Sequence, residues 1–424
     1  MRFTAALPVL IFIAALGQDR TSPAPQPEPR SVTVPLTLSH NRVIIDVSLR
    51  LSDGTTQRVH AWVDNGTPDL YMSQRLAVGG VSCDAQLCSA TPPAEMRVGG
   101  MTIPIGGRNS GAGIKEAKVP AGGAPIAPGL DAEINIPSAV LSGYDVLINF
   151  PDHQFTIAQP GSLEFKGVKT KVIVNPQNGL VQVTSQIENK KYNLALDLGA
   201  SISFLSEEVF DKLSGTHPGW PHVTGAIGPA STWGSDDETK WKLMRVDRVQ
   251  YGPLFLTDLP VASLPMDRIG FFEKRAGVPT AGLLGAEALL NYRIGIDYAH
   301  STVYFDIGRL FKFPDFDVIG LILHPEEDGR FTILGIADYD GKPSVIQGQD
   351  GVQAGDHLLA VDGIPVPGST LGQVWSMLGG SPGNERTLTV ERGGKQFNVV
   401  AKVQHFLGDA PQEGQTAGAS TKKK

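Results

Sequence analysis

Two aspartates stand in matching positions of the chain. Each lies in an Asp-x-Gly triplet that follows an apolar stretch, WVDNGTPDLYMS at Asp64 and ALDLGASISFLS at Asp197. Gly66 and Gly199 allow the backbone to turn where a Cβ would clash. Two carboxylates on such turns can face each other, share one proton and activate a water molecule. The sequence therefore predicts a paired-carboxylate site built from two halves of the chain.

The surroundings of the two aspartates are also repeated. Before each of them the sequence alternates apolar and polar residues in short strands joined by turn residues. Further on, residues 134–157 align with residues 282–305, and the second copy has a longer middle. Three matching segments in the same order indicate a duplicated, β-rich lobe.

The composition agrees with a β-rich chain of several domains. A length of 424 residues allows two or three domains, and 41% hydrophobic residues are enough for real cores. The 49 glycines and 31 prolines, with few long helical patterns, favour strands joined by many turns. A net charge of −7 offers no basic surface, so we expect no nucleic-acid partner.

In these motifs the chain resembles the aspartic proteases, most closely a bacterial retropepsin-like domain duplicated into a pepsin-like chain with two lobes. Family members carry Asp-[Thr/Ser]-Gly-[Ala/Ser/Thr] and, later in each lobe, two apolar residues followed by glycine. The resemblance covers about residues 32–312, and the second lobe matches both motifs more fully than the first. The motifs are Asp64-Asn65-Gly66-Thr67 and Asn135-Ile136-Pro137 in the first lobe, and Asp197-Leu198-Gly199-Ala200 and Leu283-Leu284-Gly285 in the second.

The resemblance implies a mainly β fold with two retropepsin-like acid-protease β-barrel lobes. It also implies an aspartic-type endopeptidase that cuts a polypeptide substrate without a cofactor. A water molecule activated by the pair Asp64 and Asp197 would attack the peptide bond, with no covalent intermediate. The substrate would lie extended in the cleft between the lobes, under hairpins that we place loosely at 96–116 and 224–250.

The residues beside the aspartates would support them unequally. Asn65 can hydrogen-bond across the pair, where family members have a hydroxyl, whereas Leu198 has no polar atom. Thr67 can hydrogen-bond the outer oxygen of the first aspartate, but Ala200 gives the second no such support. Two alternatives stay open: a peptide-binding pseudoprotease, motivated by Asn65, Leu198 and Pro137, and a protease active only as a dimer of second lobes.

The segment 316–405 changes character and resembles a PDZ domain of the bacterial protease type. Ala354-Gly355-Asp356 precedes the strand HLLAV, and residues 370–380 form a short amphipathic helix with apolar residues at helical spacing. The resemblance implies that backbone amides near Ile319-Gly320-Leu321-Ile322 capture the terminal carboxylate of a partner peptide, which adds as a strand. We expect this segment to fold independently after a junction at Phe313-Pro314-Asp315.

The two cysteines, Cys83 and Cys88, are close in sequence. In an exported chain this spacing predicts one small disulfide loop, with two free thiols as the alternative. Pepsin-like first lobes often carry such a loop after their first aspartate. The histidines are scattered and no metal-binding motif accompanies the cysteines, so we expect no metal site.

The N-terminal segment has the pattern of a secretory signal peptide. Arg2 precedes an apolar run that ends in small residues, with cleavage expected before Gln18 and an uncleaved anchor as the alternative. We therefore expect a periplasmic or secreted protein with no membrane span after cleavage. The predicted boundaries are 1–17 for the signal peptide, 18–30 for a Pro-rich linker, 31–165 and 166–312 for the two lobes, 316–405 for the PDZ domain and 408–424 for a disordered tail.

Overall fold

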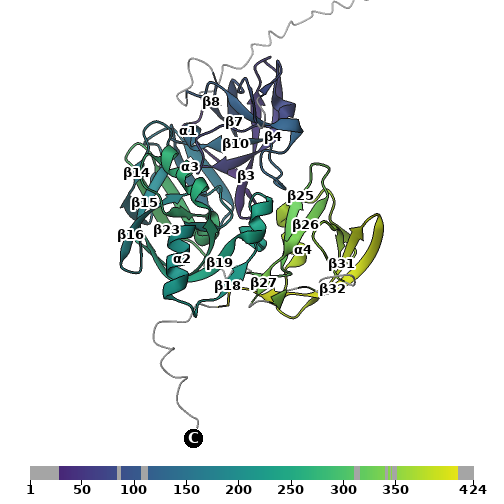
Figure 1. The fold of residues 1–424 in the computed structure, drawn as a ribbon. Helices are drawn as coiled ribbons and strands as arrows, with labels where there is room; N and C mark the ends of the chain where they lie inside the picture. Colours follow the sequence, from purple (N-terminus) through teal and green to yellow (C-terminus); the bar gives the residue numbers. More distant parts are fainter. Residues whose placement is uncertain are drawn as a thin grey trace, which may run out of the picture.

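The computed structural model describes residues 28–83, 87–106, 113–309, 316–339, 342–343, 345 and 351–408. The predicted signal peptide, most of the Pro-rich linker, the junction at 313–315 and nearly all of the predicted tail lie outside these residues. The described chain is mainly β, as the sequence predicts, with two β-rich lobes and a C-terminal region beside the second lobe (Figure 1). In the described residues, no helix is long and apolar enough to cross a membrane.

The first lobe contains a five-stranded sheet in the order β10-β4-β3-β7-β8, with β2 paired to β3, and a separate three-stranded sheet β5-β6-β9. Burial alternates over residues 46–50 of β3 and 58–63 of β4, because a sheet with one solvated face covers its core with every second side chain, whereas the first four residues of β3 are all buried. The elements are β2 Thr37–Ser39, β3 Arg42–Arg50, β4 Thr56–Asp64, η1 Gln74–Leu76, β5 Ser82–Cys83, β6 Leu87–Ala90, β7 Glu95–Val98, β8 Met101–Pro104, β9 Ala117–Pro120, η2 Ala121–Gly123, β10 Ile134–Pro137 and α1 Ser138–Leu141.

The second lobe is built on a ten-stranded sheet in the order β14-β15-β16-β21-β17-β20-β19-β18-β27-β28. The last two strands of this order come from the C-terminal region. The elements are β14 Ile173–Val174, β15 Val181–Ile187, β16 Lys190–Leu196, β17 Ser203–Ser206, α2 Glu207–Thr216, β18 His222–Thr224, η3 Gly228–Ala230, η4 Asp236–Lys240, β19 Lys242–Tyr251, β20 Leu254–Leu264, α3 Met266–Ala276, β21 Gly282–Leu284, η5 Ala286–Leu289, β27 Asp338–Tyr339 and β28 Lys342–Pro343.

A third sheet joins the two lobes, in the order β1-β12-β11-β22-β23-β13. At its centre, β11 of the first half pairs antiparallel with β22 of the second half, so that Asp145 lies opposite Asp297. The repeat found in the sequence thus becomes two equivalent hairpins meeting edge to edge. The strands are β1 Ser31–Pro35, β11 Asp145–Asn149, β12 Gln154–Ala158, β13 Val168–Lys171, β22 Tyr292–Asp297 and β23 Thr302–Ile307.

The C-terminal region has a sheet in the order β25-β26-β29-β31-β32, with β30 on β29, a small β24-β33 pair and the helix α4. The predicted amphipathic helix is present, and Thr370 and Gln373 form a capping box at its start. The elements are β24 Asp317–Val318, β25 Leu321–Pro325, β26 Phe331–Ile336, β29 His357–Val361, β30 Ile364–Pro365, α4 Leu371–Leu378, β31 Glu385–Arg392, β32 Lys395–Lys402 and β33 Gln404–His405.

This C-terminal region packs tightly against both lobes in the intact chain. Its strand β27 pairs with β18, and the two regions share one hydrophobic core that contains, for example, Ile227 and Phe316. The backbone N–H of Leu371, at the start of α4, donates to the carbonyl oxygen of Gly129 in the first lobe at 2.8 Å. Independent folding of 316–407 stays a prediction, and the shared core means that separation would expose apolar surface.

Candidate active site

Asp64 and Asp197 occupy the same place in the two lobes. Asp64 is the last residue of β4, which pairs in parallel with β10, and Asp197 directly follows β16, which pairs in parallel with β21. The Asp197 N–H donates to the carbonyl oxygen of Leu284 at 3.0 Å. Both side chains are buried, with 5% and 7% of their surfaces exposed. Each carboxylate is therefore held at the end of a strand with neighbours on both sides.

The two aspartate turns face each other across the lobe boundary. A Cβ placed on Gly66 would lie 2.1 Å from Cγ of Asp197, and one placed on Gly199 would lie 2.4 Å from Oδ1 of Asp64. No real Cβ tolerates such contacts, so each carboxylate occupies space that only a glycine of the opposite lobe leaves free. The structure brings together the two carboxylates that the sequence singled out, within one chain.

Backbone amides of its own turn hold each carboxylate. The Gly66 N–H donates to Oδ1 of Asp64 at 3.2 Å, and the N–H groups of Gly199 and Ala200 donate to Oδ1 of Asp197 at 3.0 and 3.1 Å. These bonds stabilise the ionised form of each acid and fix the direction of its side chain. Ala200 thus supports Asp197 through its backbone, although its side chain cannot do so.

Asn65 crosses from the first lobe to the second, as the sequence analysis expected. Its Nδ2 donates to the carbonyl oxygen of Leu196, and its Oδ1 accepts from the N–H of Leu198, each at 2.7 Å. The side chain of Leu198 has no polar atom and is fully buried in the hydrophobic core, so only its backbone N–H takes part in this link. One amide side chain therefore joins the two aspartate turns.

Thr67 contacts other groups than the one we predicted for it. Its hydroxyl oxygen lies 3.4 Å from Nη1 of Arg275 and accepts from the N–H of Asp69 at 3.4 Å. Arg275 also forms an ion pair with Asp69. Thr67 thus connects the first-lobe turn to helix α3 of the second lobe.

Asn135 is a site residue that the sequence analysis treated only as a departure from the glycine motif. Its Oδ1 accepts from the N–H of Tyr71 at 2.7 Å, and its Nδ2 donates to the carbonyl oxygen of Asp69 at 3.0 Å. Its amide also lowers the pKa of Asp64, against the larger effects that raise it. In the second lobe Leu283 stands at the corresponding position, and Gly285, which corresponds to Pro137, packs on Ile202, where a Cβ would lie 2.2 Å from the carbonyl oxygen. The first lobe thus has an amide side chain where the second lobe has an apolar one.

The electrostatic environment favours a pair that keeps one proton. Burial raises the pKa of Asp197 to about 6, and burial followed by the charge of Asp197 raises the pKa of Asp64 well above its usual range. Hydrogen bonds from the turns and the charge of Arg42 act in the other direction and lower both pKa values, but burial has the larger effect. Two carboxylates this close cannot both ionise easily, so the protonation belongs to the pair.

A pocket of about 610 Å³ contains both aspartates and is lined by both lobes. Aromatic and apolar side chains form much of its wall, including Trp62, Phe204, Trp233, Phe271, Phe272 and Leu283. A larger cavity of about 970 Å³ lies between β2, residues 228–229 and α4, and it contains neither aspartate. We assign the site to the smaller pocket because it contains the two carboxylates that face each other on the glycine turns.

The predicted covering hairpins are only partly related to this pocket. Within 96–116, the residues 107–112 lie outside the described chain, and β7 and β8 belong to the first-lobe sheet. Within 224–250, Thr232 and Trp233 line the pocket. Helix α3 was not anticipated, yet it contributes Asp267, Arg268, Phe271, Phe272 and Arg275 to the wall. Its amphipathic pattern, MDRIGFFEKRA, was a usable signal for a helix but not for its position.

The four residues predicted to bind a peptide C-terminus are buried in this structure. The N–H of Ile319 donates to the carbonyl oxygen of Leu378 at 3.0 Å, and the N–H of Leu321 donates to the carbonyl oxygen of Ile319 at 2.8 Å. The side chain of Ile322 packs against Gly225 of the second lobe. Peptide binding at Ile319, Gly320, Leu321 and Ile322 stays a prediction, and it requires this packing to open.

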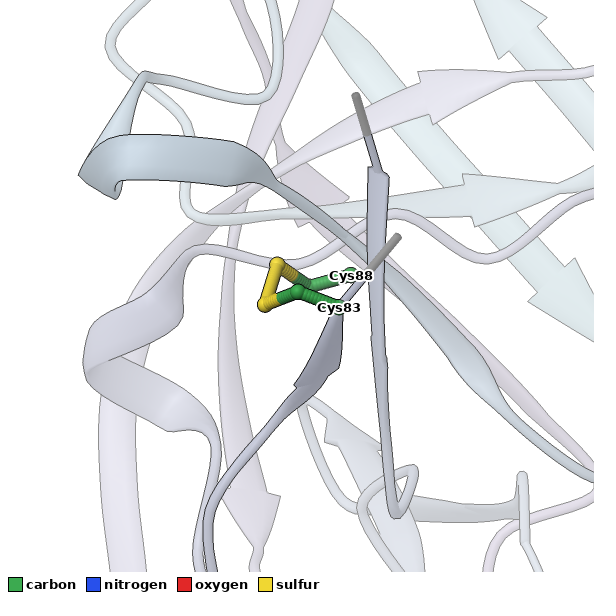
Figure 2. Close-up of a disulfide and its surroundings, with 2 residues drawn as sticks. All are labelled: Cys83 and Cys88. Carbon is green, nitrogen blue, oxygen red and sulfur yellow. A yellow bond between two sulfur atoms is a disulfide. The ribbon is translucent and has the colours of Figure 1, made fainter. Parts of the chain in front are cut away.

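The predicted disulfide between Cys83 and Cys88 is present (Figure 2). It joins β5 to β6, where the two cysteines lie opposite each other in the register. Among the described residues no group of three or more His, Cys, Asp or Glu side chains is arranged to hold a metal ion.

Comparison with known proteins gives two findings. The family model described as "Aspartyl protease" matches residues 183–288, which lie within the second lobe and include Asp197. A solved aspartic proteinase from Irpex lacteus superposes on 66% of this chain and 97% of its own, with a TM-score of 0.40 and 11% sequence identity. A comparison with curated protein sequences gives no match. The second lobe of this mainly β chain is therefore similar to an aspartyl protease domain.

Proposed function

We propose that this chain is an aspartic-type endopeptidase in which Asp64 and Asp197 act together on a polypeptide substrate. The observation that carries the proposal is the position of each carboxylate against the glycine turn of the opposite lobe. The match of residues 183–288 to an aspartyl protease family supports the same reaction class.

The two carboxylates have complementary parts in this reaction. The ionised one takes a proton from a bound water, which attacks the carbonyl carbon of the peptide bond. The protonated one hydrogen-bonds the carbonyl oxygen while negative charge develops there. The amine leaves after receiving a proton from the pair, so no covalent intermediate forms. Which aspartate starts ionised is a property of the pair.

A single chain suffices for this mechanism. Asn65 ties the turn of the first lobe to the strand that carries Asp197, and both carboxylates line the same pocket. This arrangement disfavours a dimer of second lobes, in which two copies of Asp197 would have to meet. It also disfavours the pseudoprotease alternative, because the departures at Asn65 and Asn135 keep polar contacts around the pair.

Export and a recruiting role for the C-terminal region complete the proposal. Residues 1–17 have the pattern of a signal peptide, and a disulfide is typical of an oxidising compartment such as the periplasm or the exterior. The C-terminal region would bind protein C-termini beside β25 once its contact with the second lobe opens. Weaker binding of a C-terminally amidated peptide than of its free acid would support that role.

The direct test is digestion of an unfolded protein by the purified chain between pH 3 and 7, with and without a statine-type inhibitor. We expect cleavage at internal peptide bonds, inhibition by the statine compound, and activity from a species with the mass of one chain. Absence of cleavage, with or without binding of the statine compound, would favour the pseudoprotease. Activity confined to a species of twice the mass would favour the dimer.

A further inference from the structure

Arg42 is a buried arginine at the candidate active site. It is the first residue of β3, only 2% of its surface is exposed, and it lines the pocket that contains Asp64 and Asp197. Its Nη2 donates to the carbonyl oxygen of Thr232 at 2.7 Å, and its guanidinium carbon lies 5.4 Å from the ring centre of Trp62. Its buried Nε has no hydrogen-bond partner among the described residues.

A buried cation with few partners is costly to maintain. Taking a guanidinium out of water costs several kcal/mol unless nearby negative charge compensates it. Burial lowers the pKa of Arg42 to about 10, and the charges of Asp64, Glu238 and Asp197 oppose this change, so Arg42 stays charged at neutral pH. The compensation thus comes from the carboxylates around the pocket.

The neighbouring titratable groups leave the aspartate pair as the main partner of this charge. Burial, followed by the charge of Arg42, lowers the pKa of His40 to about 3, so that imidazole is neutral. Burial raises the pKa of Glu238 to about 7. Glu238 also receives hydrogen bonds from the backbone N–H groups of Thr232, Trp233 and Gly234. These three bonds all reach its Oε1, and the hydroxyl of Ser231 donates to its Oε2 at 3.2 Å, so both oxygens are bonded within the same loop.

We propose that Arg42 is a positioning residue of the aspartate pair, a fixed buried cation that favours ionisation of the pair and so sets the pH range of the reaction. The inference rests on the proposed function. The guanidinium attracts the negative charge of the pair from a fixed position, held by Thr232 and Trp62. It thereby favours loss of the first proton at lower pH and also eases loss of the second.

Direct binding of an acidic substrate side chain fits the same residue less well. Such a side chain would have to reach a guanidinium that is almost fully buried and already bonded to Thr232. An effect on the pair requires no such access, because a charge acts through the protein interior at low effective dielectric.

The test is the pH dependence of kcat/KM for one neutral peptide substrate, measured for the wild type, Arg42→Gln, Arg42→Met and Arg42→Lys. Loss of the cation should move both limbs of the bell-shaped profile to higher pH, so that the ratio of activity at pH 7 to activity at pH 4 rises. Arg42→Lys should keep the limbs near their wild-type positions because it keeps the charge. Arg42→Met is a second variant without the charge, for use if Arg42→Gln does not fold. An apolar side chain of similar length can fill a buried site.

Two further measurements decide the interpretation. In a Glu238→Gln background, Arg42→Gln should produce the same shift, because the cation acts on the pair and not through Glu238. In the Arg42 variants, kcat/KM for an acidic peptide should fall by no larger a factor than kcat/KM for the neutral peptide. A profile whose two limbs stay at their wild-type pH in both neutral variants, or a loss of activity confined to acidic peptides, overturns the inference while the proposed function stands. Failure of the wild type to cleave or to bind a statine inhibitor overturns the proposed function itself.

Discussion

The two aspartate turns reach the same geometry by different means. In the first lobe, Asn65 reaches across with two hydrogen bonds, whereas Leu198 at the matching position of the second lobe packs in the hydrophobic core. A bidentate amide can serve both turns, since it offers one donor and one acceptor to the same backbone. The comparison teaches that the pair needs one polar link across the lobes, and that this link need not be symmetric.

The segments that close each turn differ in the same way. In the first lobe, the side chain of Asn135 bonds the backbone of Tyr71 and Asp69, while Leu283 at the matching position of the second lobe packs in a hydrophobic core. The first lobe thus has amide side chains at two positions where the second lobe has leucines. Removal of a polar side chain should therefore harm the first lobe most, and added volume at the turn glycines should harm both lobes.

The largest expected effect tests whether the aspartate of each lobe is required for catalysis. Asp64→Asn and Asp197→Asn should each lower kcat by about 10²- to 10⁴-fold, because an amide can neither hold nor release the shared proton. Thermal unfolding of both variants should remain cooperative. Full activity of Asp64→Asn beside an inactive Asp197→Asn would restrict the chemistry to the second lobe.

Added volume at the turn glycines should affect both lobes alike. A Cβ on Gly66 or Gly199 would lie within 2.1 to 2.4 Å of the opposite carboxylate, so Gly66→Ala and Gly199→Ala must displace it. We expect at least a 10²-fold fall in kcat/KM, of the order that a misplacement of about 1 Å produces. Gly215→Ala is the matched control, since no atom lies within 4 Å of its added Cβ. Wild-type activity in Gly66→Ala would disprove the facing arrangement.

Substitutions at the matching positions 65 and 198 should affect the two lobes differently. Asn65→Leu leaves the carbonyl oxygen of Leu196 and the N–H of Leu198 without partners, and each unsatisfied buried group costs about 1–3 kcal/mol. Activity should fall with stability because the two turns lose their link. Leu198→Met, a volume-conserving change in the matching position, should cost less than about 1.5 kcal/mol. Chemical denaturation measures the unfolding free energy of both variants. Equal losses of stability in Asn65→Leu and Leu198→Met would contradict the asymmetry that we infer.

The sequence predicted the parts of this site that are local. Asp64, Asp197 and their glycines form continuous motifs, and the repeat of strands around them indicated the duplicated β-rich lobes. Arg42 and Asn135 were missed because their roles depend on distant residues. Arg42 begins an ordinary strand, and its partner Thr232 lies 190 positions away. Helix α3 was missed for the same reason, since only the tertiary packing places it at the pocket.

The raised pKa of Asp197 predicts how stability depends on pH. Its pKa is 3.8 in the unfolded reference and about 6 in the fold, so folding favours the protonated form. This contribution is fully present below about pH 4 and is lost as the pH rises through 6. The difference in unfolding free energy between wild type and Asp197→Asn should therefore shrink or reverse from pH 4 to pH 7. Other acids such as Asp152 contribute equally to the unfolding free energies of both proteins, so their contributions cancel in this difference. The pKa of Asp152 is lowered by hydrogen bonds from Asn149 and Arg293.

The smallest effect concerns the disulfide, a feature that the described second lobe does not share. Closing the short loop between Cys83 and Cys88 contributes about 2 kcal/mol by loop-entropy arguments. The double variant Cys83→Ser/Cys88→Ser should lose about that much stability. Its dyad chemistry should stay near wild type, because the β5–β6–β9 sheet contains neither of the strands that position Asp64 and Asp197. Hydrogen exchange should increase in residues 81–90 and 117–120 and stay unchanged in β16 and β21. Faster exchange in the second lobe would mean that the two lobes depend on each other more than their separate sheets indicate.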